Sequence, residues 1–192
     1  MDGFFYILIW SIGIVIFLLM LILYLTNRIN NKMWYLFWIG FTIGMCWELP
    51  MSIANELGIC CSYPFPPATF NTPIPLQGPL AVIIISITHS FWDGGLFLLC
   101  CIFVYIFCNK PIFNKFKKCE LWILVLFGQL QEFIVELIST YSSGWYYNLY
   151  WFNPPLFPWM GHYITLLPQL IWFVASIMYY IIVLKIKPKT IK

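Results

Sequence analysis

Charged side chains are scarce in this sequence, and their scarcity excludes a soluble globular protein. Asp, Glu, Lys and Arg make up 9% of the 192 residues, hydrophobic residues make up 62%, and the mean hydropathy is +0.86. Soluble domains carry about 25% charged residues. No stretch is polar enough to form a separate soluble domain. We therefore predict one transmembrane domain over residues 1–192, with the lipid bilayer as its surroundings.

Motifs for metal or nucleic acid binding are also lacking. The seven cysteines form no CxxC pair and show no His/Cys ligand spacing, so we expect no metal, no cofactor and no redox motif. The net charge of +3 does not indicate nucleic acid, because the basic residues follow hydrophobic segments. We expect Cys60 and Cys61 in an outer loop, where oxidation is conceivable. Cys46, Cys100 and Cys101 are expected to pack inside helices as small hydrophobic side chains.

Five hydrophobic segments reach the length of roughly 20 residues that spans a bilayer. They predict an all-α, polytopic bundle of five transmembrane helices at about 4–25, 34–55, 80–107, 121–141 and 162–184. The first segment has no basic leader and no small-residue cleavage site. We therefore expect a retained helix rather than a cleaved signal peptide.

The basic residues predict the orientation of the bundle. All ten follow the first, third or fifth segment: Arg28, Lys32, Lys110, Lys115, Lys117, Lys118, Lys185, Lys187, Lys189 and Lys192. With five spans these residues share one side of the membrane. The positive-inside rule makes that side cytoplasmic, so we expect the N-terminus outside, on the lumenal side, and the C-terminus in the cytoplasm.

Two longer loops are expected on the outer side. Residues 57–79 are rich in Pro and Gly and show no helix or strand periodicity. Residues 142–161 are rich in Trp, Tyr, Asn and Pro. The second loop has two interpretations: an aromatic belt at the membrane interface, or a lid over a cavity that opens toward this leaflet.

A carboxylate lies deep within the second segment, at Glu48 in the stretch 44–50. A charge at the centre of a membrane helix costs about 2.5–3.5 kcal/mol, so such a residue is a functional-site hypothesis by default. A rise of about 1.5 Å per residue places further polar residues at a similar level, roughly 8–20 Å below the outer boundary. They come from four segments: Glu48; His89 and Asp93; Glu132 and Glu136; and Gln169.

The spacing of these residues predicts shared helix faces. His89 and Asp93 are four residues apart, as are Glu132 and Glu136, and Gln129 extends the latter face. If the faces converge, several carboxyls share a dry volume with at most one imidazolium. Such surroundings favour neutral acids, which can donate protons near pH 7.

Simpler interpretations remain open for each residue. Glu48 can be a structural hydrogen-bonding residue, His89 and Asp93 can satisfy each other, and Glu136 can face water at the interface. Gly94 and Gly95 indicate close helix contact rather than contact with a substrate.

Aromatic rings adjoin the polar positions, among them Trp47, Trp92 and Trp172. Packing and an interfacial belt account for most rings in a membrane protein. Together with protonated acids, however, such rings suit an apolar sterol or isoprenoid, because an acid can protonate an alkene and a ring can stabilise the carbocation.

The residues resemble the emopamil-binding protein family, the EXPERA group, whose founding enzyme is a sterol Δ8–Δ7 isomerase of the endoplasmic reticulum. The similar stretches are 34–57, 92–95 and 127–129, with a weaker one at 168–172. The resemblance implies an acid and a histidine one turn apart on the second helix, an acid on the third and a Trp on the fifth. Glu48, Asp93 and Trp172 match the acids and the Trp, whereas the histidine position is occupied by Gly44.

A second resemblance is to the integral-membrane terpene cyclases of meroterpenoid pathways. Residues 46–48 look like their acid motif on the second helix, although those enzymes have more spans. Both resemblances imply proton delivery to a carbon–carbon double bond of an isoprenoid.

We therefore expect a membrane-embedded sterol or isoprenoid isomerase. The expected catalytic residues are Glu48, His89, Asp93 and Glu132, with substrate-binding residues Trp47, Trp92, Gln129, Glu136, Gln169 and Trp172. The alternatives are a terpene cyclase, a non-catalytic sterol or lipid binder, a proton-coupled carrier and a structural subunit. The resemblance implies the endoplasmic reticulum membrane. A homodimer is one option for the oligomeric state, and no nucleic acid partner is expected.

Overall fold

The computed structural model describes residues 4–61, 68–70 and 78–186, which form a bundle of helices with short strands at one end. The helices are α1 (Phe4–Leu25), α2 (Asn31–Cys61), α3 (Pro79–Phe107), α4 (Lys118–Tyr141) and α5 (Leu166–Lys185). The strands are β1 (Ala68–Phe70), β2 (Trp145–Tyr147), β3 (Pro155–Trp159) and β4 (His162–Thr165). All five helices are long and apolar enough to cross a membrane.

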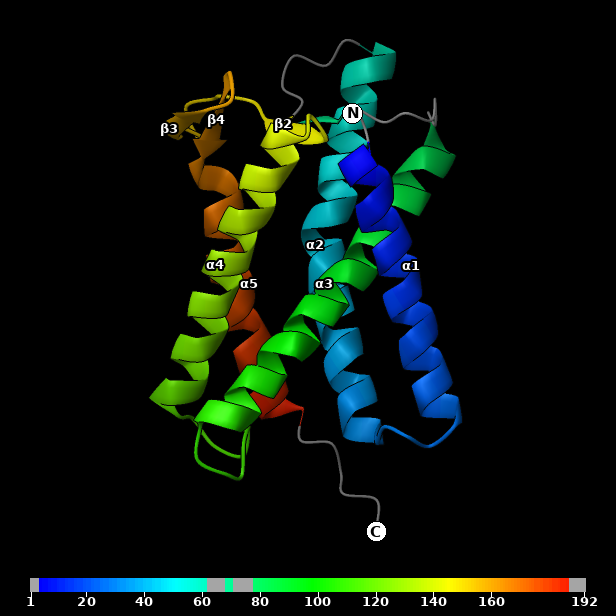
Figure 1. Cartoon of the computed structure of the whole chain (residues 1–192), viewed down its shortest axis with the longest axis vertical. Helices are drawn as coiled ribbons and strands as arrows, with labels where there is room; N and C mark the ends of the chain where they lie inside the picture. Colours follow the sequence, from blue (N-terminus) through cyan, green and yellow to red (C-terminus); the bar gives the residue numbers. More distant parts are fainter. Residues whose placement is uncertain (1–3, 62–67, 71–77, 187–192) are drawn as a thin grey trace.

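Helix α3 crosses the bundle obliquely and connects its two halves (Figure 1). It packs against α1 and α2 on one side and against α4 on the other, while α4 pairs with α5. Glycines permit the close crossing with α2: a Cβ on Gly94 would lie 3.0 Å from the backbone oxygen of Phe37. Gly95 faces the side chain of Ile16 on α1. The prediction that Gly94 and Gly95 allow close helix contact is confirmed.

The core and the outer surface of the bundle are both apolar. Phe37, Phe97 and Tyr179 are buried between α2, α3 and α5, and the Phe97 and Tyr179 rings stack with their centroids 4.4 Å apart. Exposed hydrophobic side chains on every helix point outward, for example Val15 and Leu130. This outer surface suits lipid rather than water, because water would penalise so large an apolar patch.

The two ends of the bundle differ in charge. The described Lys and Arg residues lie in or beside the α1–α2 and α3–α4 connections or at the end of α5, all at one end. We call this the basic end; the predicted Lys187, Lys189 and Lys192 lie outside the described residues. The opposite end carries the strands. There β1 pairs with β2 and β3 pairs with β4, both antiparallel.

Element boundaries differ from the prediction at both outer loops. Helix α2 continues through Pro50 to Cys61 instead of ending near residue 55, so Cys60 and Cys61 are helical rather than in a loop. The loop predicted to lack strands contains β1, which pairs with β2 far along the chain. Residues 162–165 form β4, and α5 begins only at Leu166. Strands of three to five residues are too short to show a clear periodicity, and β1 in addition depends on pairing with the distant β2.

Candidate active site: an acidic cavity between the helices

A cavity of about 60 Å³ lies toward the strand end of the bundle, enclosed by α1 to α5 and β2. Its polar lining comes from Glu48, His89, Asp93, Gln131, Glu132 and Tyr147, and its aromatic lining from Trp47, Trp92, Trp145 and Trp172. Four helices and one strand therefore each contribute a polar or aromatic side chain to one small volume.

Glu48 of α2 and His89 of α3 form the central pair of the cavity. The Glu48 Oε2 and the His89 Nδ1 are 3.1 Å apart, and the two side chains are 17% and 9% exposed. The Trp47 indole N–H donates to the other carboxyl oxygen of Glu48 over 3.1 Å. The Ser86 hydroxyl donates to the Glu48 backbone carbonyl over 3.4 Å, and this hydrogen bond connects α3 to α2 beside the pair. Both oxygens of Glu48 are thus held in fixed directions.

Asp93 lies one turn after His89 and is buried against α2. A Cβ added at Gly44 would lie 2.5 Å from the Asp93 Oδ2, so the carboxyl fills the space that a side chain at position 44 would need. The predicted pairing of His89 with Asp93 is therefore not what the structure has, since His89 bonds to Glu48 instead. The absence of a side chain at Gly44 is what lets the acid approach α2.

Glu132 of α4 completes the group of carboxyls. It is 6% exposed, it hydrogen-bonds the side chain of Trp172 from α5, and it lies close enough to Glu48 and Asp93 for electrostatic interaction. The three carboxyls therefore influence one another's charge, and His89 is the one imidazole among the described residues of the lining.

Two buried polar atoms of this lining have no hydrogen-bond partner among the described residues. They are the Asp93 Oδ2 and the Gln131 Oε1. Leaving a buried polar atom unsatisfied costs about 1–3 kcal/mol, so such atoms in a cavity wall indicate a place for a water or a ligand. Both belong to residues of the cavity lining.

Strand β2 closes the cavity at the strand end. Trp145 and Tyr147 are two residues apart and so point to the same side of the strand, into the cavity wall. Burial of the phenol, followed by the nearby carboxyls, raises the pKa of Tyr147 well above its ordinary value. Tyr147 is therefore a neutral hydrogen-bond donor at physiological pH. Residues 142–161 had two interpretations, a lid over a cavity and an aromatic belt at the membrane interface. Strand β2 fits the first interpretation, whereas Trp151, 92% exposed, fits the second.

Three predicted binding residues lie outside the cavity. The Glu136 carboxylate accepts three hydrogen bonds, over 2.9–3.3 Å. The donors are the Gln169 side chain and the backbone N–H and hydroxyl of Thr165. Gln129 donates to the Gln169 carbonyl over 2.9 Å. Glu136, 1% exposed, therefore does not face water. These contacts fasten α4 to the start of α5.

Helix geometry explains why α4 divides its polar residues between two places. An α-helix turns about 100° per residue, so Gln129 and Glu136 lie about 60° and 40° to one side of Glu132, toward α5. Gln131 and Val135 lie about 100° and 60° to its other side, toward the cavity. The spacing of three or four residues was a sufficient signal for a shared face, but it did not say which side of that face meets the cavity.

Sequence reasoning missed Gln131, Trp145 and Tyr147 as parts of the lining. The alternation of Trp145 and Tyr147 was a usable signal within the predicted lid, while Gln131 carried none beyond its place beside Glu132. A disulfide between Cys108 and Cys119 at the basic end was also missed, because the two cysteines are 11 residues apart and form no recognisable motif. The described residues contain no cluster of His, Cys, Asp and Glu that could hold a metal ion.

No family model, no curated protein and no solved structure matches this chain.

Proposed function

We propose that this protein is a membrane-embedded isomerase that shifts a carbon–carbon double bond in a sterol or isoprenoid lipid. The observation that carries the proposal is the placement of Glu48, Asp93 and Glu132 around one cavity, with His89 bonded to Glu48. Buried ionisable groups are costly in a membrane protein and commonly mark its reaction sites.

The reaction needs an acid and a base on either side of a short-lived cation. A carboxylic acid gives its proton to one alkene carbon, the π electrons form the new C–H bond, and the neighbouring carbon becomes a carbocation. A base then removes a proton from an adjacent carbon, and that electron pair forms the shifted double bond. We assign Glu48 as the donor, His89, which bonds to Glu48, as the relay, Asp93 as the base and Glu132 as a second acid. Trp47, Trp92 and Trp172 are walls that stabilise the cation by cation–π contact.

The resemblance to the sterol isomerase family fits this arrangement in an altered form. The family pattern pairs the acid of the second helix with a histidine one turn earlier, and position 44 here is Gly. In this chain His89 of α3 contacts Glu48 across the helix interface, while Asp93 occupies the space beside Gly44. We propose that His89 takes the part of the missing histidine.

The sizes of the hollows favour a flexible substrate over a rigid ring system. The acidic cavity has about 60 Å³, enough for a few waters, whereas ligand pockets usually have about 300–1,000 Å³. An apolar groove of about 310 Å³ between α2 and α5 shares Trp47 and Ile171 with the cavity. A prenyl chain could lie in this groove with one double bond at the carboxyls. This observation makes an isoprenoid cyclase the second candidate.

Deuterium transfer from solvent tests the proposal whichever product forms. The purified protein in nanodiscs is incubated in D₂O with a Δ8-unsaturated sterol or with an acyclic prenyl lipid, and the recovered lipid is examined by mass spectrometry. We expect deuterium to be incorporated into one of the two lipids, the sterol or the prenyl lipid. Removal of a general acid costs typically 10²–10⁴-fold, so Glu48→Gln should lower the incorporation rate by about 100-fold or more. Glu56→Gln, two turns further along α2 and outside the cavity lining, is the matched control.

The outcomes separate the rival functions. An unchanged mass with a shifted double bond in H₂O supports the isomerase, and a product with fewer double bonds supports the cyclase. Tight retention of the lipid without deuterium uptake identifies a binder. Equal incorporation by the wild type and by Glu48→Gln would remove Glu48 from the mechanism.

A further inference from the structure

A second hollow lies at the basic end, far along α2 and α3 from the acidic cavity. It has about 350 Å³ and is bounded by the start of α2, the second half of α3 and Ile112 of the connection to α4. Leu36 and Leu98 form a buried floor, while Ile102 and Tyr105 are exposed at the rim. We call it the basic-end groove. Because its walls belong to membrane-spanning helices and its rim is open, it faces the acyl region of the bilayer.

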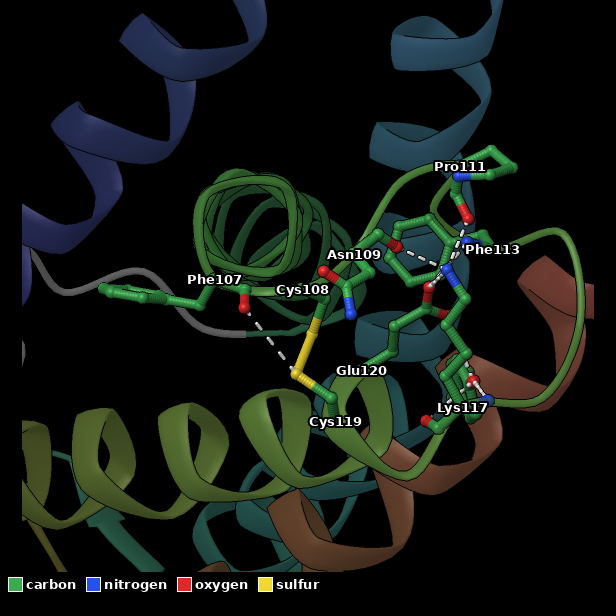
Figure 2. A network of polar contacts seen from close by, with 9 residues as sticks. Phe107, Cys108, Asn109, Pro111, Phe113, Lys117, Cys119 and Glu120 are labelled. Carbon is green, nitrogen blue, oxygen red and sulfur yellow. Dashed lines mark hydrogen bonds and ion pairs between the residues drawn. A yellow bond between two sulfur atoms is a disulfide. The ribbon is translucent and has the colours of Figure 1, made fainter.

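The outer wall of this groove is fixed by a network of polar contacts (Figure 2). Glu120, fully buried, accepts the Phe113 N–H over 3.1 Å and the Tyr180 hydroxyl over 3.0 Å, and its carboxylate lies 3.6 Å from the Lys117 ammonium. Lys117 also donates to the carbonyls of Asn109 and Pro111. The connection that carries Ile112 is therefore fastened to the start of α4 and to α5.

A disulfide between Cys108 and Cys119 closes the same connection at its base. The Lys110 ammonium lies 3.7 Å from the centroid of the Tyr105 ring, which stands at the groove rim. The groove thus has a preformed wall and the Lys110 cation beside its rim. Contacts within the protein hold both in place without a ligand.

The charge at the mouth of the groove has one sign. Its lining contains Lys32 and Asn30 and, among the described residues, no Asp or Glu. Lys32, in the first turn of α2, is itself part of the lining, so the groove wall includes a cationic side chain. Asn30 caps the start of α2 by accepting the Met33 N–H over 3.0 Å, so the partial positive charge of the helix start adds to that of Lys32. Basic pockets between transmembrane helices are suited to anionic lipid headgroups.

We propose that the basic-end groove binds one anionic phospholipid, with its phosphate at Lys32 and one acyl chain along Leu36, Leu98 and Ile102. Charge complementarity selects the headgroup, because the mouth offers a cation and, in the part of the chain that the structure describes, no competing carboxylate. The apolar floor selects a molecule with a chain rather than a free phosphate. This site does not depend on the reaction proposed for the acidic cavity.

Native mass spectrometry of the full chain in neutral detergent tests the proposal. The protein is titrated with dioleoyl phosphatidylglycerol and, separately, with dioleoyl phosphatidylcholine. We expect one phosphatidylglycerol to bind more tightly than phosphatidylcholine. Lys32→Gln should weaken phosphatidylglycerol binding roughly fivefold, the factor for one Lys near a charged lipid. Lys115→Gln, an exposed lysine of the same end outside the groove, should leave binding unchanged.

A second pair of variants tests the chain position. Ile102→Trp fills the groove and should weaken both lipids, whereas Leu99→Trp, exposed on α3 outside the groove lining, should weaken neither. Equal affinity of the wild type for the two lipids overturns the proposal. An equal loss of phosphatidylglycerol affinity in Lys32→Gln and Lys115→Gln also overturns it, because the lipid would then be attracted to the basic end as a whole. Unchanged binding in Ile102→Trp would place the lipid elsewhere.

Discussion

Position 44 decides how closely Asp93 can approach α2. An added Cβ would lie 2.5 Å from the Asp93 Oδ2 and 2.9 Å from its Cβ, so Gly44→Ala must displace the acid. If Asp93 takes part in the proposed proton transfer, a displacement of about 1 Å should lower deuterium incorporation by roughly 100-fold. The assay of the proposed function measures this loss.

Gly40→Ala on the same face of α2 is the control for packing alone. Its Cβ would meet Phe97 at 2.9 Å and the Cα of Gly94 at 3.1 Å, with no carboxyl atom among its three nearest neighbours. Overpacking costs about 1–3 kcal/mol, so both variants should have lower unfolding temperatures. If Gly40→Ala loses as much incorporation as Gly44→Ala, the effect comes from helix packing and not from Asp93.

Tyr147 gives the lid a predictable pH dependence. Burial and the nearby carboxyls raise its pKa in the folded protein, whereas a tyrosine in the unfolded chain ionises at about pH 10. The stability that depends on the neutral phenol is therefore complete below about pH 10 and is lost as the pH rises further. Tyr147→Phe should reduce the fall in unfolding temperature between about pH 9 and pH 11.

Differential scanning fluorimetry in detergent across this pH range measures the slope. Tyr163→Phe, which removes a phenol that is 42% exposed on β4, is the control and should leave the slope unchanged. A slope in Tyr147→Phe equal to that of the wild type would show that the phenol ionises as readily in the folded protein as in the unfolded chain.

Residues of the cavity could be predicted from the sequence where they carry an ionisable side chain, because burying a charge in a membrane has a high free-energy cost. Glu48, His89, Asp93 and Glu132 stand out because charge within a spanning segment has a high cost, and the structure brings all four to one cavity. Gln131 could not be predicted, because only the rotation of α4 decides whether Gln129 or Gln131 meets the cavity beside Glu132. That rotation is set by packing against α5, which no local pattern records.

Among the elements, the crossing of α1 and α3 is closest at Gly13. A Cβ at Gly13 would clash with the backbone oxygen of Thr88, and backbone cannot move aside as a side chain can. Gly13→Ala should therefore separate the two helices and lower stability by about 1–3 kcal/mol. The unfolding temperature in detergent measures this loss.

Gly95→Ala is the matched variant on the other side of the same interface. Its Cβ would meet only the side chain of Ile16, at 2.9 Å, and that side chain can rotate. The loss in Gly95→Ala should be smaller. Equal losses of stability in the two variants would mean that α1 shifts as easily as the Ile16 side chain rotates. The close contact at Gly13 would then not fix the position of α1.

The helices were predictable as elements and the strands were not. Each spanning segment carries its own signal, since about 20 apolar residues have to form a helix in lipid. The pairing of Ala68 with Tyr147 joins segments that are distant in the chain and short, so neither segment predicts the other. The end of α2 was misplaced because about 20 residues suffice to span a bilayer, and the helix continues beyond that length to Cys61.

For the whole molecule, orientation and disulfide chemistry are linked. The described basic residues share one end, and the positive-inside rule places that end in the cytoplasm. The Cys108–Cys119 disulfide lies at the same end, yet cytoplasmic thiols are usually kept reduced. In a reducing cytoplasm the pair would be thiols, and the Glu120 contacts alone would hold the connection between α3 and α4.

Labelling with a membrane-impermeant maleimide determines which compartment this end faces. A cysteine at Lys115 marks the basic end, and one at Trp151, 92% exposed, marks the strand end. If the basic end is cytoplasmic, intact cells should label the Trp151→Cys variant, and Lys115→Cys should need permeabilised cells. Replacement of Cys46, Cys60, Cys61, Cys108 and Cys119 by Ser in both variants leaves only the buried Cys100 and Cys101 beside the introduced cysteine. The reverse pattern would place the basic end in an oxidising compartment, which would overturn the proposed orientation and leave the disulfide intact in the cell.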